Sequence, residues 1–441
     1  MIIQSNSLQD IKLPNPIRQV QGNVSIQYNP ALQSLLGLQS LQHIEGDLRI
    51  VGNPGLYDLS GLDNLQYIGG DLVLRNNAQL ARLAGLEKVA IKGSIIIASN
   101  PALATLEGLT VGADLQGHLR LQTNMNLHDL NTLSSLESVE GDLLIANNSS
   151  LKTIAVFNEL SSIGGDLRLV FNAGLEEITA FSQLQSIGGS LVVEGNRSLS
   201  RLGVFPELLT IAKEFLLRNL PALEEAGSFS RLNNIGTQLR LIKLASLSAA
   251  PIFEQNFSLG SHLEIRNNVE LTEISGLAKL QAINGKLIVR HNAQLTSLIG
   301  LGAIEATSIR ELELLYNPLL DFCHVTSVCN FLNREDIVAK VELNTTNCAT
   351  APAIQDQCQT ELVTGNVDLQ VFPNPATDHI QLPFQAGTRS LRLISSNGQT
   401  LRELNNWSGT RLSIQDLAAG SYYLEIVDQH DQVRRLSFVK Q

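Results

Sequence analysis

The sequence predicts a fold dominated by β-structure: a β-solenoid of about 13 coils of 24 residues, followed by a small immunoglobulin-like β-sandwich. Three observations favour it: a short strand pattern that returns every 24 residues, four clustered cysteines, and a separate run of alternating strands near the C-terminus. The expected segments are a partial N-terminal coil or cap (1–21), the solenoid (22–320), a cysteine-bearing cap (321–360), a linker (361–371) and the C-terminal domain (372–441).

The repeat is defined by the first apolar residue of each short strand. These anchors, spaced by 24 with one 23 and one 25, are Val24, Leu48, Leu72, Ile95, Leu119, Leu143, Leu167, Leu191, Phe215, Leu239, Leu263, Leu287 and Leu312. The shared template is G-x-L-x-I-x-x-N-x-x-L-x-x-L-x-x-L-x-x-L-x-x-I. Its strand is too short to pair within one coil, so we expect a parallel sheet that runs from coil to coil.

The rest of each coil has a different period. Apolar residues return every three positions, as at Leu56, Leu59, Leu62, Leu65 and Ile68. That spacing fits neither a strand nor a sustained helix, and it predicts short extended or 3₁₀ segments that turn around a core. One coil cannot bury its own leucines, so the coils must stack and both ends need caps.

An asparagine follows nearly every strand. A side-chain amide both donates and accepts hydrogen bonds, so a stack of asparagines predicts an internal structural ladder. Its members are Asn53, Asn77, Asn100, Asn124, Asn148, Asn172 and Asn196, with Asn29, Asn268, Asn292 and Asn317 in the same position. Leu220 and Leu244 interrupt the series, and we expect the turn to change shape there; a bend, a packing variant and a recognition feature all remain open.

The charge balance and the first residues limit the partners and the location. The 31 Lys plus Arg against 42 Asp plus Glu give a net charge of -11, which argues against nucleic acid or an anionic membrane as partner. No apolar run is long enough to span a bilayer. The start, MIIQSNSLQD, lacks the pattern of a signal peptide. Because Met1 falls inside the second half of a repeat, the simplest interpretation is a truncated N-terminus.

The clustered cysteines indicate a feature confined to one segment of the chain. Cys323, Cys329, Cys348 and Cys358 are spaced C-x5-C-x18-C-x9-C, which lacks the closely spaced ligand pairs of zinc sites. Two local disulfides are the better interpretation, with their pairing left open. They imply an oxidising, extracytoplasmic location.

The template resembles the receptor L-domain class of leucine-rich repeats, through its G-D-L-x-I strand opening and its N-x-x-L-x-x-L-x-G-L tail. The resemblance extends over about Gly22 to Leu320. The high copy number is similar to long bacterial surface proteins of this class, and the stretch NPLLDFCHVTSVCNFL looks like their C-terminal cap. The resemblance implies a binding role, and the missing kinase segment and furin-like module exclude a receptor kinase.

The C-terminal segment resembles the type A sorting domain of the type IX secretion system of Bacteroidota. The match is carried by VFPNPATDHIQL, SLRLISSNGQTL and RLSIQDLAAGSYYLEI, and its motif residues are Pro373, Asn374, Pro375, Asp378, Asn397, Gly398, Gly420 and Tyr422. The alternating residues and the Asn-Gly turn independently predict a compact antiparallel β-unit. The resemblance implies recognition by the secretion machinery and display on, or release from, the cell surface.

Signs of catalysis are weak. The sequence has no nucleophile elbow, phosphate loop or dinucleotide fingerprint, and we expect no cofactor or metal. Asp47, Asp71, Asp142 and Asp166 share one column of the repeat, which a polysaccharide-acting enzyme could use as paired carboxylates. Ser94, His118 and Ser190 interrupt the column, so a structural role is the better interpretation.

The outward strand position is the candidate ligand face. It mixes arginine with bulky apolar residues, a composition typical of interfaces. The proposed contact residues are Arg49, Arg120, Leu144, Arg168, Leu216 and Arg240. We therefore expect a non-catalytic adhesion or recognition protein for a protein or glycan; the alternatives are a polysaccharide-acting enzyme and a purely structural surface component.

Overall fold

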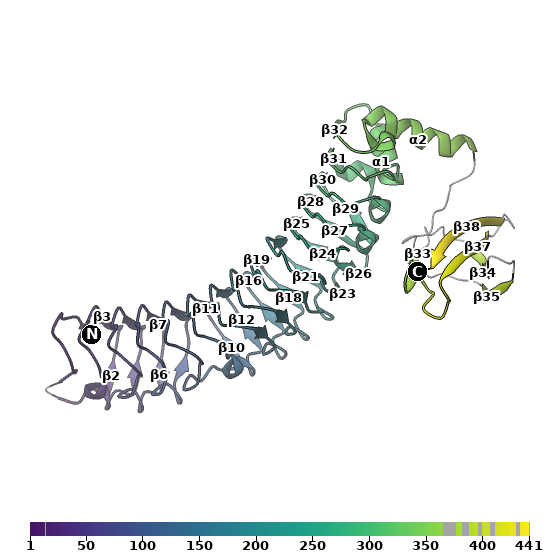
Figure 1. Cartoon of the computed structure of the whole chain (residues 1–441). Coiled ribbons are helices and arrows are strands. Elements are labelled where there is room, and N and C mark those ends of the chain that lie inside the picture. Colours follow the sequence, from purple (N-terminus) through teal and green to yellow (C-terminus); the bar gives the residue numbers. More distant parts are fainter. Residues whose placement is uncertain are drawn as a thin grey trace. The chain divides into compact units, whose positions relative to one another are not determined.

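The chain forms two compact units, Met1–Cys358 and Gln359–Gln441. The structure is a computed structural model, and it describes residues 1–13, 15–364, 376–381, 388–395, 399–405, 411–428 and 433–440. The first unit is the predicted solenoid, in which the chain winds through successive stacked coils (Figure 1).

One parallel sheet of 15 strands runs the length of the solenoid, on the inner side of its curve (Figure 1). The pairing follows the repeat, so that Leu48 lies opposite Leu72 and Leu143 opposite Leu167. The strands are β1 (Ile2–Ile3), β3 (Val24–Gln27), β5 (Leu48–Val51), β7 (Leu72–Arg75), β9 (Ile95–Ala98), β11 (Leu119–Gln122), β13 (Leu143–Ala146), β16 (Leu167–Val170), β19 (Leu191–Glu194), β22 (Phe215–Arg218), β25 (Gln238–Ile242), β28 (His262–Arg266), β30 (Gly285–Arg290), β31 (Ile309–Leu315) and β32 (Val338–Glu342).

Strands β3 to β31 are the 13 strands that the repeat predicts, and β1 and β32 extend the sheet at its two ends. The placement of Met1 in the second half of a repeat was wrong. Ile2 and Ile3 pair with Ser25 and Ile26, so the first residues occupy the strand position of a coil. The template missed β1 because Met1 itself corresponds to the anchor Val24. The G-x opening that identifies the other copies therefore has no counterpart in the printed sequence.

The remainder of each coil consists of short extended and 3₁₀ segments, as the period of three predicts. One side sheet contains β2 (Gln19–Val20), β4 (His43–Ile44), β6 (Tyr67–Ile68) and β8 (Ala90–Ile91); the next contains β10 (Asp114–Leu115), β12 (Ser138–Val139), β15 (Ser162–Ile163), β18 (Ser186–Ile187), β21 (Thr210–Ile211), β24 (Asn234–Ile235), β27 (Phe257–Leu259) and β29 (Leu280–Ala282). Smaller sheets join β14 (Thr153–Ile154), β17 (Glu177–Ile178) and β20 (Arg201–Leu202), and β23 (Ser228–Phe229) with β26 (Ile252–Phe253). The 3₁₀ turns are η1 (Leu36–Leu38), η2 (Asn131–Leu133), η3 (Ser275–Leu277), η4 (Ile299–Leu301) and η5 (Ala306–Ser308).

The template leucines and isoleucines form one continuous core, and its middle is aromatic. In five successive coils a phenylalanine replaces the same leucine. Phe157, Phe181, Phe205, Phe229 and Phe253 stack with ring centroids 5.5, 5.8, 5.2 and 5.3 Å apart. We call this column the phenylalanine spine. Stacked pairs contribute about 0.5 to 1.5 kcal/mol each beyond the area they bury.

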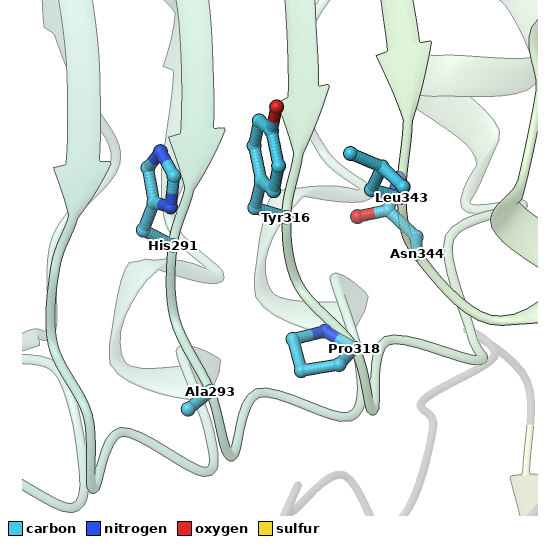
Figure 2. A pocket seen from close by; sticks show the side chains of 6 residues that line it. All are labelled: His291, Ala293, Tyr316, Pro318, Leu343 and Asn344. Atoms are coloured by element: carbon cyan, nitrogen blue, oxygen red, sulfur yellow. The ribbon is translucent and has the colours of Figure 1, made fainter.

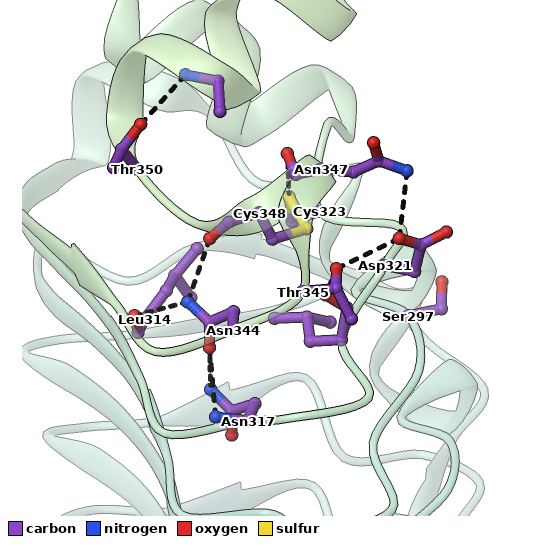
Figure 3. The surroundings of a disulfide bond; sticks show 12 residues. Ser297, Leu314, Asn317, Asp321, Cys323, Asn344, Thr345, Asn347, Cys348 and Thr350 are labelled. Carbon is purple, nitrogen blue, oxygen red and sulfur yellow. Dashed lines mark hydrogen bonds between the residues drawn. A yellow bond between two sulfur atoms is a disulfide. The ribbon is translucent and has the colours of Figure 1, made fainter.

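A disulfide-bonded cap closes the C-terminal end of the solenoid. It contains α1 (Thr326–Leu332), β32, η6 (Thr346–Cys348) and α2 (Ala351–Thr364). The pairs Cys323–Cys348 and Cys329–Cys358 confirm the prediction of two local disulfides and supply the pairing. Beside the first pair, Asn347 donates a hydrogen bond to Asp321 (Figure 3). Helix α2 continues through Thr364, and therefore includes the first residues of the expected linker.

The second unit contains two antiparallel sheets. One pairs β33 (His379–Gln381) with β36 (Arg411–Ser413), and the other has the order β35 (Thr400–Asn405), β34 (Thr388–Ser395), β37 (Gly420–Asp428), β38 (Val433–Lys440). Both sheets contribute to one apolar core, which includes Ile380, Leu393, Leu412, Leu424 and Phe438. Two sheets around one core agree with the predicted sandwich.

Candidate functional site

The asparagines form a ladder inside the turns, interrupted only at Leu220 and Leu244. Asn148 shows the pattern: its Oδ1 accepts the backbone N–H of Asn124 at 3.0 Å, and its Nδ2 donates to the carbonyl of Leu121 at 2.9 Å. The side chains of the series are fully buried, so these bonds satisfy backbone groups that water cannot reach. The N-terminal segment of the ladder contains Asn29, Asn53, Asn77, Asn100, Asn124, Asn148, Asn172 and Asn196.

The expected change of turn shape at Leu220 and Leu244 was wrong. The residues before them, Asn219 and Lys243, have φ of 53° and 56°, and Asn147 in a regular coil has 56°. The turn keeps its shape because the left-handed residue sets it, while leucine fills the space of the amide. Both leucines are fully buried, so their side chains cannot contact a partner.

The ladder has a last rung that the sequence did not reveal. Asn344 accepts from the N–H and from the Nδ2 of Asn317, both at 3.1 Å, and its own Nδ2 donates to the carbonyls of Leu314 and Cys348 (Figure 3). It lies 27 residues after Asn317, so a fixed spacing of 24 misses it. The I-x-x-N part of the template, present as Val341 to Asn344, would have found it.

The carboxylates of the possible enzyme column form a second ladder. Asp47 Oδ1 accepts the N–H of Asp71 at 2.9 Å, and Asp71 Oδ1 accepts the N–H of Ser94 at 2.7 Å. His118 takes the same role, because its Nδ1 accepts the N–H of Asp142 at 2.8 Å. This ladder runs from Asn23 to Ser190, and His262 provides a similar rung further along. One oxygen of each carboxylate is thus used to hold a turn.

Two of these carboxylates have lowered pKa values. Burial opposes ionisation of Asp142, but the N–H of Asp166 and the neighbouring Arg120 and His118 outweigh it, and the pKa falls below its usual value. The pKa of Asp47 is lowered in the same way, with burial opposed by the N–H of Asp71 and by Arg49. Both groups are therefore held in the ionised form, which suits a structural acceptor and not a general acid.

The arginines of the predicted ligand face are paired with carboxylates of their own sheet. Arg49 Nη2 lies 2.8 Å from Asp47, Arg120 Nη2 lies 2.8 Å from Asp142, and Arg168 Nη1 lies 3.9 Å from Asp166. The side chains of all three remain about two-fifths exposed. They can contact a partner, but only while keeping these ion pairs.

Arg240 pairs with two carboxylates and is less exposed than the other three arginines. Its guanidinium lies 3.2 Å from Glu214 and 2.7 Å from Glu264. Glu264 also contacts Arg266 and lies 4.0 Å from Arg290. Burial opposes ionisation of Glu264, yet Arg240 and Arg266 together lower its pKa below the usual value. The arginines and glutamates in this part of the sheet pair with one another, so little unpaired charge remains for contact with a partner.

An apolar strip crosses the middle of the same outward face. Leu144, Ala146, Val170, Val192, Leu216 and Ile242 contact one another there, from β13 to β25, separate from the solenoid core. Arg168 separates Leu144 from Val192 along the sheet, and Arg240 follows Leu216. The sequence identified Leu144 and Leu216 but missed Val170 and Ile242, because only one of the two outward columns was considered.

Part of the predicted sorting motif has a structural role. Gly420 begins β37, and the Tyr422 hydroxyl donates to the carbonyl of Ala418 at 2.8 Å while its ring stacks on Phe438. Pro373, Asn374, Pro375 and Gly398 lie outside the described residues. Within the described part of the chain no cluster of metal-ligating side chains is found, and no helix is long and apolar enough to cross a membrane.

Comparison with known families agrees with this organisation. Residues 18–110 match the family model of the Receptor L domain, and the coils beyond residue 110 carry the same template. Residues 370–440 match the Secretion system C-terminal sorting domain. No curated protein and no solved structure matches the chain significantly. The chain is therefore a secreted or surface-attached protein that joins a receptor L-domain-like leucine-rich-repeat solenoid to a type IX secretion C-terminal sorting domain.

Proposed function

We propose that this protein is a non-catalytic recognition or adhesion protein, which binds a protein partner through the outward face of its main sheet. The observation that carries the proposal is the apolar strip. Leu144, Val192 and Leu216 point away from the solenoid core and form a cluster where a solvated sheet face normally carries polar side chains. Neighbouring side chains cover most of the strip, since Val192 and Leu216 are only 2% and 5% exposed, so Leu144 is its most accessible member and a partner would meet the strip together with the side chains around it.

The size and surroundings of the strip favour a protein over a glycan. The five strands from β13 to β25 span roughly 19 Å at a strand spacing of about 4.8 Å. An apolar centre with arginine at its margin is typical of protein interfaces. The charges beside the strip are largely neutralised, since Arg218 pairs with Glu194 at 2.6 Å and Arg240 with Glu264. A glycan is the second candidate partner.

The enzyme alternative has less support. A glycosidase needs two carboxylates that are free to act as acid and as base or nucleophile. Here Asp47 and Asp142 each accept a backbone N–H and an arginine hydrogen bond. In the purely structural alternative the apolar strip only packs against itself and meets no partner. The sorting domain supports delivery to the cell surface, where a recognition protein would meet its partner.

The test places charge on the strip. The double variant Val192→Lys/Leu216→Lys adds two ammonium groups that can extend into solvent. Gln122→Lys is the matched control, since Gln122 also faces outward from the sheet but lies outside the strip. The purified full chain would be applied to arrays of extracellular proteins and of glycans. We expect the double variant to lose the protein signals that the native chain and the control retain; unchanged signals would contradict the proposal.

A further inference from the structure

A hollow of about 570 Å³ opens at the end of the last strands of the solenoid (Figure 2). Its wall is formed by three successive coils: His291 follows β30, Tyr316 follows β31 and Leu343 follows β32. Ala293, Pro318 and Asn344 complete the lining. It lies on different strands from the apolar strip, so its function is independent of the function proposed above.

The backbone at this hollow favours other residues. His291, Tyr316 and Leu343 have φ of 55°, 55° and 58°, in the left-handed region. The same position in the other coils holds six glycines or asparagines, such as Gly52 and Asn147, which adopt this conformation readily; the remaining coils carry Tyr28, Ser99, Thr123, Phe171 and Lys243. A bulky residue there costs about 1 kcal/mol or more. His291, Tyr316 and Leu343 differ from the bulky residues elsewhere in this series because they occupy three adjacent coils, so their side chains lie next to one another.

These side chains form an apolar platform at the ends of three adjacent strands, and it is open to solvent. The rings of His291 and Tyr316 are stacked, with centroids 4.5 Å apart and planes within 9°. Tyr316 is 46% exposed and Leu343 is 57% exposed. Figure 2 shows the two rings side by side at the ends of neighbouring strands. Because the two rings stack on each other, a ligand would meet their exposed edges and outer faces together with Leu343.

Polar groups border the platform. Among the described residues, none hydrogen bonds to the Tyr316 hydroxyl or to the ring of His291. The Asn344 amide is used in the ladder, so it supplies only the floor of the hollow. None of the six lining residues carries a carboxylate, ammonium or guanidinium group, and nearby Arg290 lies 3.7 Å from Glu313. The hollow therefore offers stacking and neutral hydrogen bonding without strong charge.

We propose that this hollow binds a neutral sugar ring of an oligosaccharide. One face of a pyranose consists of C–H groups that pack on an aromatic ring, while its hydroxyls reach the phenol and the imidazole. The volume falls within the roughly 300 to 1,000 Å³ of small-ligand pockets. An anionic sugar would find no lysine or arginine among the lining residues.

The test uses the full chain with cellohexaose and chitohexaose, two neutral β-linked oligosaccharides, at millimolar concentration in calorimetry. Tyr316→Asn and His291→Asn remove the platform and place in each turn a residue that suits its backbone, so the fold is retained. Phe171→Asn is the matched control. Phe171 has φ of 57° at the same position of another coil and is 48% exposed, but it lies against Gly195 and outside the hollow.

We expect Tyr316→Asn to weaken binding of at least one probe by about tenfold or more, the equivalent of about 1.4 kcal/mol. The Phe171→Asn control and the Val192→Lys/Leu216→Lys variant should bind like the native chain. No binding of either probe by the native chain would overturn the proposal, and so would equal binding by Tyr316→Asn. Tighter binding of an oligogalacturonate than of the neutral probes would also overturn it.

Discussion

Replacing Asn148 by alanine tests whether the asparagine ladder stabilises the solenoid. The substitution removes the acceptor of the Asn124 N–H and the donor to the Leu121 carbonyl. Each buried group left without a partner costs about 1 to 3 kcal/mol, so we expect a loss of about 2 to 6 kcal/mol in the free energy of unfolding. A water molecule that entered the vacated space would bring the loss toward the lower value.

Two further variants separate the hydrogen bonds from the volume of the side chain. Asn148→Leu reproduces the natural residue of two other coils and fills the space, but leaves the same two backbone groups unpaired. Asn126→Ala is the matched control, because Asn126 lies two residues after Asn124, the neighbouring rung of the ladder, and has an exposed side chain. We expect Asn148→Leu to be destabilised as well, and Asn126→Ala to stay within about 0.5 kcal/mol of the native chain.

The assay combines urea unfolding with amide hydrogen exchange, since a long repeat array need not unfold in one step. Exchange reports the specific site: the Asn124 amide should lose protection in both Asn148 variants. An unfolding midpoint for Asn148→Ala equal to that of Asn126→Ala, together with unchanged protection of Asn124, would refute the reasoning that the ladder is a source of stability.

Four other outcomes follow from the structure. Because the folded-state pKa of Glu264 lies below its ordinary value of 4.5, its contribution to stability is present above that pH and is lost as the pH falls toward the folded-state value; Glu264→Gln should show a shallower acid limb in pH-dependent unfolding. Reduction of the disulfides, or Cys329→Ser, should cost about 3.5 kcal/mol for each closed loop of 25 or 29 residues, seen as a lower melting temperature in reducing buffer. Phe205→Ala should cost about 3 to 5 kcal/mol and Phe205→Leu clearly less, because leucine fills this position in other coils. Deletion of 372–441 should leave the solenoid folded by circular dichroism but abolish surface display, and normal display would contradict the role of the sorting domain.

Most of the fold could be predicted because several independent constraints fix the position of each repeat residue. Leu48, Asn53 and Ile68 are each fixed by their copies one coil away, so pattern, pairing and burial all give the same answer. The ends of the array were harder. At β1 too little of the template precedes the strand, and at β32 a longer connection containing α1 shifts Asn344 out of the spacing.

The site was predicted less well for physical reasons. A sequence shows that Arg240 faces outward, but it does not show that Glu214 and Glu264 are within ion-pair distance of its guanidinium. The hollow depends on the left-handed φ of Tyr316 and on the ring of His291, which lies one coil away. One unusual signal was visible in the sequence. At the position just before the ladder asparagine, two adjacent coils carry aromatic residues, His291 and Tyr316.

The last two coils of the phenylalanine spine, which contain Phe229 and Phe253, are the coils in which both polar ladders are interrupted. The asparagine ladder loses its amides at Leu220 and Leu244, and the second ladder runs only to Ser190 before His262 provides a rung again. In those two coils the inter-coil contacts inside the solenoid are made by aromatic rings in place of side-chain hydrogen bonds. Between Asn196 and Asn268 the stacking of coils therefore relies on the main-sheet pairing and on ring packing, and the last two strands under the apolar strip, β22 and β25, lie in that interval.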